Sequence, residues 1–440
     1  MDKEIKNLCS RIIKTAQDEG ANECKATIAR SRNVTIRYRN HKPEVIKEAT
    51  TQSLFLEVYL KGKYAFQSTP DLRQNTLGDF IKKLILNAGY LEEDPYRSLP
   101  DSVMYEGRSD ADIQIYDPAY NDFSPEQRHS LIQDVENACL DMGGEKIISV
   151  DAEISDQFNE FIALTSNGFE GEAEGTRFDV ETNMSAQDEG DRKPQGYSYF
   201  GTRLLGDLPA AEIIAKQTIR DTLNQLGAKK IKTEKLPVII ENKNVSRVLS
   251  GFLSAMNGQN LQQQSSFLID KKGKQIGSKL FTIIDDPFIK KGLGSKRFDN
   301  DGFPARKRTI IENGILNEYY IDWYYSRKME CDPTTGGSSN LIIPVGSRSV
   351  EEIMKDLGRG ILVTGFIGGN SNSTTGDFSN GIFGQLFDQG QIVHPVAEMN
   401  IADNHSEFWN KLVEVANDPW KYSSRLMPSL VFEDIMVAGG

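Results

Sequence analysis

The chain has 440 residues, which is more than one hydrophobic core usually organises, so its length predicts two or three domains. Charged residues make up 26% of the sequence and the formal net charge is −12, which disfavours a sequence-independent grip on nucleic acid phosphates. Four widely spaced cysteines without a CxxC pair argue against a disulfide framework and a zinc ribbon, and no run of eighteen apolar residues predicts a membrane span. We therefore expect a cytoplasmic protein.

The N-terminal segment predicts a helix, an antiparallel meander and a second helix. Apolar side chains recur at intervals of three and four over residues 2–18, which is typical of an amphipathic helix. Alternating and β-branched runs over residues 23–40 and 50–69, with a break at Arg32-Asn33, indicate strands. Residues 75–91 then predict a helix.

The same order of elements returns in the next segment, which predicts an internal duplication. Ser124 is suited to cap the first helix of this second unit, with Pro125 at its first helical position. The expected elements are a helix over 124–142, strands over 147–168, 175–188 and 196–205, and a helix over 209–226. Residues 1–226 are therefore interpreted as one α+β domain.

Residues 227–440 differ in composition, with more glycines, shorter strands and turn pairs such as Asn313-Gly314 and Gln389-Gly390. Helices are expected only over 244–256, 350–358 and 405–416. The predicted fold class is α+β, with duplicated N-terminal helix, antiparallel meander and helix units followed by a mostly β C-terminal domain.

The helix that begins near Asn244 follows a buried strand and carries few chemical groups. Asn244 is suited to its N-cap, and Arg247 is the charged residue on its polar face. The apolar stripe predicts packing against a core. The residues of this stripe are Val245, Val248, Leu249, Phe252, Leu253 and Met256.

No complete catalytic set is evident. None of the four histidines has the partner spacing of a zinc-binding helix face. Residues 394–407 hold two histidines and three acids, but a strand that leads into a helix would keep these groups apart. Basic residues between Lys271 and Arg308 alternate with glycines and acids, and favour solvated turns over a polyanion site. FDNDGF lacks the closing glutamate of a calcium loop.

The most unusual segment is glycine-rich and spans residues 365–384. Small side chains leave the backbone accessible, so this segment could pair with an extended peptide. The alternative is a tightly turning region in which backbones approach one another. The residues expected to contact a peptide or partner are Gly368, Gly369, Asn370, Ser371, Thr375, Gly376 and Asp377.

Several blocks of the C-terminal half occur in an order that resembles the TldD/PmbA family, also called modulators of DNA gyrase. The blocks are FLIDKKGKQIGSKLFTIIDDP (267–287), RFDNDGFPARKRTIIENGILNEYYIDWYYSRKM (297–329), ILVTGFIGGNSNSTTGDFSNGIFGQLFDQGQIVHPVAEMNIADN (361–404) and PSLVFEDIMVAGG (428–440). The resemblance implies a peptidase assembly in which a TldD-type subunit binds zinc through HExxxH and a late cysteine, while a PmbA (TldE)-type subunit partners it.

In this chain the family's metal-binding positions fall near Leu249, Ser250 and Leu253, and no cysteine follows Cys331. Aliphatic and hydroxyl side chains cannot replace imidazoles as zinc ligands. The resemblance therefore implies a subunit without metal or other cofactor, with zinc expected in a TldD-like partner subunit and a peptide as substrate. A homodimer is the expectation for the chain alone, because exposed strand edges favour association.

Two alternatives remain open at the level of sequence. The first is a self-contained hydrolase with an unrecognised site, for example between His394 and Glu407. The second is a non-enzymatic modulator of a DNA-associated enzyme such as gyrase, for which the net charge of −12 makes direct nucleic acid contact unfavourable.

Overall fold

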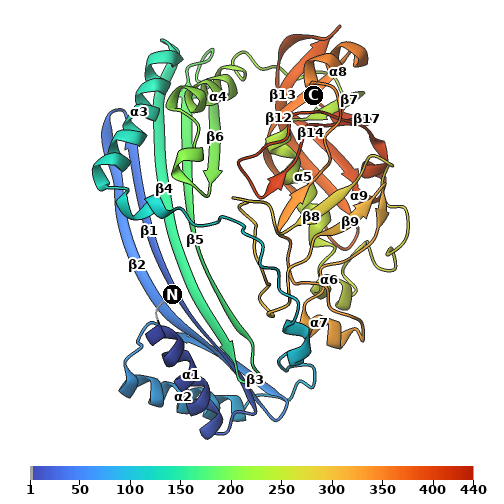
Figure 1. The fold of residues 1–440 in the computed structure, drawn as a ribbon. Helices are drawn as coiled ribbons and strands as arrows, with labels where there is room; N and C mark the ends of the chain where they lie inside the picture. The colour runs from blue at the N-terminus through green and yellow to red at the C-terminus, as the bar shows by residue number, and fades with distance from the viewer. Residues whose placement is uncertain (1–2, 440) are drawn as a thin grey trace.

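The computed structural model describes residues 3–439, and its first half is built around one long antiparallel sheet (Figure 1). The strand order is β3-β2-β1-β4-β5-β6, so the first strands of the two repeats, β1 and β4, pair at the centre. Each repeat runs helix, three strands, helix, which confirms the predicted duplication. The elements are α1 (Lys3–Asp18), β1 (Glu23–Arg39), β2 (Lys42–Leu60), β3 (Lys63–Thr69), α2 (Gln74–Gly89), α3 (Pro125–Gly143), β4 (Ile147–Thr165), β5 (Glu170–Ala186), β6 (Gln195–Thr202) and α4 (Ala211–Leu223).

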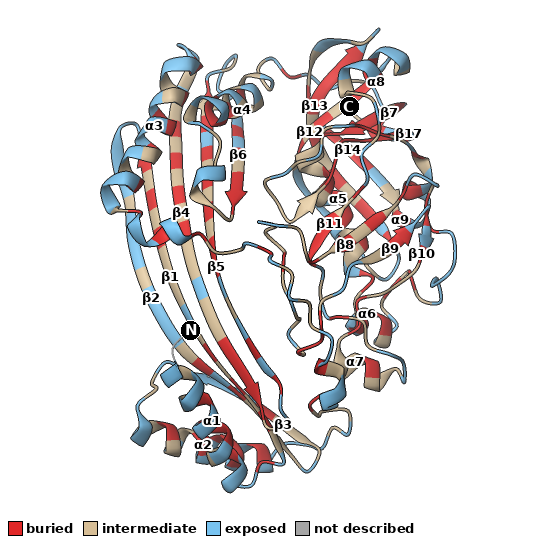
Figure 2. Cartoon of the chain, in the orientation of Figure 1, coloured by how far each residue is buried: buried red, intermediate tan, exposed pale blue. Residues whose placement is uncertain are grey.

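The helices of this half cover one face of the sheet, at its two ends. Ile28 and Leu56 are buried under α1 and α2, and Ile154 and Val180 are buried in the core beside α3 and α4. Side chains of successive strand residues point to opposite faces. The face that the helices do not cover therefore carries more polar residues than the face beneath them. That face turns toward the C-terminal half (Figures 1 and 2).

A fully buried ion pair joins α3 to β4. The Nε atom of Arg128 donates to Oδ2 of Asp156 at 2.6 Å, and its Nη2 atom donates to Oδ1 at 2.9 Å. The third nitrogen donates to the carbonyl oxygen of Phe123. The two side chains are 1% and 0% exposed, so the charge of Arg128 is compensated entirely inside the protein.

The C-terminal half folds around a sheet that closes on itself. Its strand order is β14-β13-β12-β7-β17-β15, and β14 also pairs with β17. A smaller sheet has the order β10-β9-β8-β11-β16. The strands are β7 (Glu234–Ile240), β8 (Ile283–Asp286), β9 (Arg308–Glu312), β10 (Ile315–Leu316), β11 (Asn340–Ile342), β12 (Gly360–Ser371), β13 (Asp377–Asp388), β14 (Gln391–Asn404), β15 (Leu412–Val415), β16 (Arg425–Leu426) and β17 (Leu430–Ala438).

Short helices complete this half, which confirms its mostly β character. They are α5 (Asn242–Ser254), α6 (Gly258–Gln262), α7 (Trp323–Lys328), α8 (Val350–Leu357), α9 (His405–Phe408) and the 3₁₀ turn η4 (Trp409–Lys411). The N-terminal half contains three further 3₁₀ turns, which are η1 (Ser102–Tyr105), η2 (Pro118–Asp122) and η3 (Leu205–Asp207). Among residues 3–439, no helix combines the length and apolarity needed to cross a membrane.

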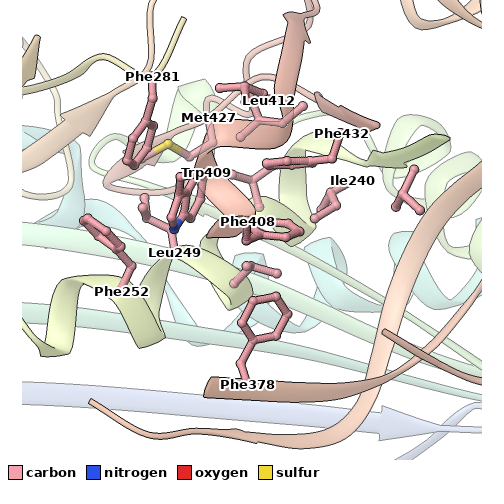
Figure 3. Packing of buried hydrophobic residues seen from close by; sticks show 14 of the residues in the cluster. Ile240, Leu249, Phe252, Phe281, Phe378, Phe408, Trp409, Leu412, Met427 and Phe432 are labelled. Carbon is pink, nitrogen blue, oxygen red and sulfur yellow. The ribbon is translucent and has the colours of Figure 1, made fainter. Parts of the chain in front are cut away.

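The largest apolar core lies in the C-terminal half (Figure 3). Trp409 is fully buried and stacks on Phe281, with ring centroids 4.3 Å apart. Leu249 and Phe252 of α5 reach this core from one side, and Phe432 of β17 reaches it from another. The core therefore fixes the position of α5 relative to the closed sheet.

Two sequence expectations about element bounds were wrong. Strand β1 continues through Arg32-Asn33 in unbroken register with β2, because Asn33 pairs with Ala49 as an ordinary strand residue. The expected helix over 405–416 ends at Lys411, and residues 412–415 form β15. Leu412 and Val415 are buried there, so tertiary packing overrides the local helical pattern.

Candidate functional site

Helix α5 follows directly from the buried strand β7. Its N-cap is Glu241, and the predicted N-cap Asn244 lies in the first turn instead. The side chain of Asn244 donates to the carbonyl oxygen of Thr364 at 2.9 Å. Asn244 is therefore committed to the neighbouring strand β12 and not to the end of its own helix.

Glu241 does not cap α5 with its carboxylate because that group belongs to a charged network between the two halves. Arg220 of α4 pairs with Asp221 at 3.3 Å and also with Glu241. Lys243 lies 3.5 Å from Glu241 and also binds Asp221. Burial raises the pKa of Glu241, and the charges of Lys243 and Arg220 oppose this shift. The opposite charges of Glu241 and Lys243, on either side of Asn242, are the sequence signal of this network.

The positions expected to match the family's metal ligands do not form a site. Leu249 is fully buried in the core and Leu253 packs partly buried against it, whereas Ser250 is exposed. Counted strictly from 249, the HExxxH spacing ends at Ser254, which is also exposed. The polar side chains that these positions expose on α5 are therefore the hydroxyl groups of Ser250 and Ser254.

The side chains around α5 do not fit a zinc ion. Among residues 3–439, no three His, Cys, Asp or Glu side chains gather in a group that could hold a metal. The hydroxyl of Ser250 instead accepts a hydrogen bond from the guanidinium of Arg425. The positive charge of Arg425 beside Ser250 repels a metal cation. Both the available donor atoms and the local charge therefore disfavour zinc binding at this surface.

His405 lies close to the same face of α5 but is held in an inert tautomer. The indole N–H of Trp409 donates to Nδ1 of His405 at 3.3 Å. In the neutral ring the proton is then on Nε2, which donates to Oγ of Ser371 at 3.0 Å. Burial lowers the pKa of His405 to about 4, opposed by the charge of Asp403. His405 therefore cannot accept a proton from Ser371 in the way a serine nucleophile requires.

The other groups of the acid-rich segment are dispersed. His394 bonds through Nδ1 to the carbonyl oxygen of its neighbour Pro395, at 2.8 Å. Glu398 lies 3.3 Å from Lys230, and Asp403 lies 2.7 Å from Lys411. His394, Glu398 and Asp403 thus have different partners, and these three groups do not form one cluster.

The glycine-rich segment forms the end of β12, a turn and the start of β13. Gly368, Gly369 and Gly376 have φ values of 66°, 112° and 86°, which side chains rarely adopt. Gly368 through Ser371 and the side chains of Thr375 and Asp377 are exposed, whereas Gly376 is buried.

The turn is fixed by polar contacts. Thr375 donates to Asp377 at 2.7 Å, and Asn404 donates to the other oxygen of Asp377 at 2.8 Å. The seven residues expected to contact a peptide or partner therefore lie together on one ordered hairpin.

The free edge of β12 faces α5 beyond its pairing with β7, which ends at Val363. Two of its carbonyl groups already accept side-chain hydrogen bonds, at Thr364 from Asn244 and at Gly368 from Arg247 at 3.2 Å. A peptide strand added along this edge would have to displace these bonds. The hairpin tip is less obstructed than the edge.

A cavity of about 530 Å³ lies between the two halves, beside the N-terminal part of α5. Its size is within the range of ligand pockets, which often form between domains. Tyr197 and Tyr199 contribute from β6, Phe366 from β12, Ser246 from α5 and Trp420 from the segment before β16. This pocket could not be predicted from local sequence patterns, because its wall residues come from both halves of the chain.

A second cavity, of about 1360 Å³, separates the polar face of the long sheet from residues 295–300. Lys296 and Arg297 of the predicted basic stretch line it. Lys307 and Arg308 pair instead with the acids Asp286 and Asp285, at 2.8 and 3.1 Å. The basic residues thus do not form one continuous surface.

The chain matches two domain descriptions of one family: the PmbA/TldA metallopeptidase central domain over residues 118–226 and the PmbA/TldA metallopeptidase C-terminal domain over residues 233–439. Metalloprotease PmbA of Escherichia coli O157:H7 is 26% identical over 429 residues, which cover 97% of this chain and 94% of the relative. TldE of Thermococcus kodakarensis is similar in fold, with a TM-score of 0.85 and 19% identity over 98% of this chain and 100% of that one.

A candidate modulator of DNA gyrase from Bacteroides thetaiotaomicron has a crystal structure with a TM-score of 0.97, 35% identity and complete coverage of both chains. Two consecutive family domains and full-length similarity agree with one another. This chain belongs to the PmbA/TldD family of metallopeptidase-related proteins.

Proposed function

We propose that this chain is the metal-free, PmbA/TldE-like subunit of a TldD-type metallopeptidase complex that cuts peptides or unfolded segments. The observation that carries the proposal is the surface of α5, where Leu249 and Ser254 stand at the imidazole positions of HExxxH and Ser250 stands at the glutamate position. The guanidinium of Arg425 at Ser250 adds a positive charge to this surface. Zinc and the catalytic water are accordingly assigned to the partner subunit.

The role of this chain in the complex is to complete and cover the site of the partner. The hairpin from Gly368 to Asp377 supports this role, because its exposed tip is held in shape by the bonds among Thr375, Asp377 and Asn404. An ordered and exposed hairpin can bind another chain without a large loss of conformational entropy. We propose this hairpin as the contact surface for the partner subunit or for the peptide.

A self-contained hydrolase is less well supported. Its best candidate pair is Ser371 and His405, and the indole of Trp409 directs the proton of His405 toward Ser371. A direct role on DNA is also disfavoured, because the net charge is −12 and several basic side chains are paired with acids.

Co-expression with a TldD-type subunit tests the proposal. We expect the two chains to co-purify as a heterodimer that contains zinc and hydrolyses an unstructured peptide, while either chain alone has little activity. The chain alone should bind no zinc at stoichiometric levels, and its size in solution tests the expected homodimer. The matched control is the complex in which the glutamate of the partner's HExxxH is replaced by glutamine. Full activity of the partner without this chain, or tight stoichiometric zinc in this chain alone, would contradict the proposal.

A further inference from the structure

A row of charged side chains crosses the face of the long sheet that the helices do not cover, and it ends at the 530 Å³ cavity. Arg37 of β1 lies opposite Glu153 of β4, which in turn lies opposite Glu181 of β5. The next residue across the sheet is Tyr199 of β6. Glu181 and Tyr199 both line the cavity. The row therefore holds two acids and one base, and the acid without a base on its far side lies in the cavity wall.

The arginine of this row does not compensate Glu181. Its Nη2 atom lies 2.6 Å from Glu153, and its Nε atom lies 3.5 Å from Asp151. Within residues 3–439, Glu181 has no ion-pair partner. Like charges directly opposite each other destabilise a sheet, and Glu153 and Glu181 form such a pair. Burial and the charges of Glu153 and Asp179 accordingly raise the pKa of Glu181.

The neighbouring acids on the same face of the sheet are each paired. Asp151 lies 2.7 Å from Arg39, on the adjacent strand. Asp179 lies 2.8 Å from Arg177, two residues earlier on its own strand. Glu181 is thus an exception among its neighbours, and pairing within the sheet does not explain why an acid stands at this position.

The remaining charges of the cavity wall compensate each other. The residues that line the cavity include three with charged side chains, which are Glu181, Asp221 and Lys243. The ammonium of Lys243 donates to Oδ2 of Asp221 and lies 3.5 Å from Glu241. The lining therefore carries one excess negative charge, and its carboxylate belongs to Glu181.

Aromatic rings from both halves of the chain line the same cavity. They are Tyr197, Tyr199, Phe366, Phe383 and Trp420. Trp420 is held in place by Phe200, with ring centroids 5.5 Å apart. The face of an aromatic ring attracts a cation, and partly desolvated surroundings strengthen the attraction of a carboxylate for the same cation. A carboxylate among aromatic rings is therefore suited to an ammonium or a guanidinium group.

Resting on the peptide substrate of the proposed function, we propose that Glu181 and these aromatic rings bind a positively charged group of a peptide in the interdomain cavity. The charge of the ligand compensates the acid that Arg37 leaves unpaired and relieves its repulsion with Glu153. A peptide offers such a charge on a lysine or arginine side chain or at its amino end. A metal ion fits less well, because no three His, Cys, Asp or Glu side chains among residues 3–439 gather to hold one.

Fluorescence anisotropy with the purified full-length chain tests this inference. Each probe is an unstructured Ala/Ser octapeptide with an uncharged fluorophore at its carboxyl end. The first probe has an acetylated amino end and one central lysine, the second has an acetylated amino end and a central Nε-acetyl-lysine, and the third has an unmodified amino end and a central Nε-acetyl-lysine. We expect the first probe to bind about 10- to 100-fold more tightly than the neutral second probe, which is the range for a charge-assisted bond. The third probe distinguishes the amino end from a side chain as the source of the charge.

Glu181→Gln should remove the difference between the charged and the neutral probes, and Glu181→Asp should retain part of it because the charge remains. Glu92→Gln is the matched control, since it removes an equal charge from an exposed residue outside the cavity and should leave the difference intact. Measurement at about 0.15 M salt screens the general attraction of a cation to the acidic chain. Because Glu181→Gln removes a repulsion with Glu153, its melting temperature should be unchanged or higher.

Equal binding of the charged and neutral probes to the unaltered chain, no binding of any probe at millimolar concentration, or an unchanged difference in Glu181→Gln would overturn the inference. An equal loss in Glu92→Gln would also overturn it, because the attraction would then come from the net charge. A heterodimer that assembles and cleaves peptides without any preference for a positive charge refutes only the role of Glu181, whereas failure to assemble refutes the proposed function.

Discussion

The region of the buried ion pair between α3 and β4 and the region around α5 hold their ionisable groups in opposite ways. Under α3, Arg128 and Asp156 form a fully buried pair with two N–H···O bonds, and a carbonyl oxygen takes the remaining nitrogen. Around α5, Arg425 has no acid partner among residues 3–439, and burial lowers the pKa of His405 so that its ring stays neutral. The first arrangement satisfies both charges inside the fold, whereas the second leaves the charge of Arg425 without a counter-charge among the described residues.

The largest expected effect comes from breaking the buried Arg128–Asp156 ion pair. Asp156→Asn keeps the shape of the side chain but leaves the charge of Arg128 buried without compensation, which should cost about 3–5 kcal/mol of unfolding free energy. Urea unfolding followed by far-ultraviolet circular dichroism measures this cost. Trp409 lies in the C-terminal core, whereas Trp420 packs on Phe200 and Trp323 donates to Ser98, so tryptophan fluorescence also reports contacts between the two halves.

The control is the double variant Arg128→Met with Asp156→Leu, which removes both charges and should recover most of the loss. A loss of unfolding free energy below about 1 kcal/mol for Asp156→Asn would contradict the complete burial of the ion pair, because only exposed pairs contribute so little.

A smaller effect is expected from pH in the other half. The pKa of His405 is lowered to about 4, below its ordinary value of 6.5, so the unfolded chain binds more protons between these two values. The contribution of His405 to stability is therefore complete above pH 6.5 and is lost as the pH falls toward 4. At pH 5 the loss should be about 2 kcal/mol.

Urea midpoints at pH 7.5 and pH 5, read by tryptophan fluorescence, measure this loss. His405→Gln can keep both neighbours bonded without titrating, so the difference between the two proteins isolates His405 from other groups. A pH dependence that is the same in both proteins would contradict the assigned burial.

Two helical glycines give a matched comparison of smaller size. A Cβ atom on Gly251 of α5 would clash with Oγ of Ser371 and would lie 2.9 Å from Nε2 of His405. A Cβ atom on Gly78 of α2 would meet nothing within 4 Å. Gly78→Ala should stabilise by about 0.5–1 kcal/mol, while the steric conflict in Gly251→Ala should outweigh the same helical gain and destabilise by about 1 kcal/mol. Denaturant unfolding of both variants decides, and a stabilising Gly251→Ala would contradict the close contact of α5 with Ser371.

Periodicity in the sequence was sufficient for the repeated half but not for the site. The alternation of apolar residues and the Ser124-Pro125 helix start predicted the duplicated units, because both signals are local. The interdomain cavity was not predicted, since Tyr197 and Phe366 are far apart in the sequence and meet only after folding.

The polar contacts of the site were hidden for the same reason. Asn244 has the identity of a cap residue, yet its partner is Thr364, 120 positions away. His405 was assigned to an acid-rich segment, but the contact that decides its tautomer is with Trp409. No sequence pattern singles out Arg425, because the presence or absence of an acid partner can be seen only when its spatial neighbours are known.

The smallest expected effect on stability concerns Arg425 itself and completes the comparison with Arg128. Arg425→Met removes a charge that has no acid partner in the described part of the chain, and it keeps much of the aliphatic volume. The lost bonds to Ser246 and Ser250 are therefore partly offset by relief of the desolvation cost. We expect a change of less than about 1 kcal/mol in urea unfolding, against several for Asp156→Asn. A loss of several kcal/mol would place Arg425 with Arg128 as a residue that serves the fold. A near-neutral result would show that the fold does not depend on the guanidinium of Arg425.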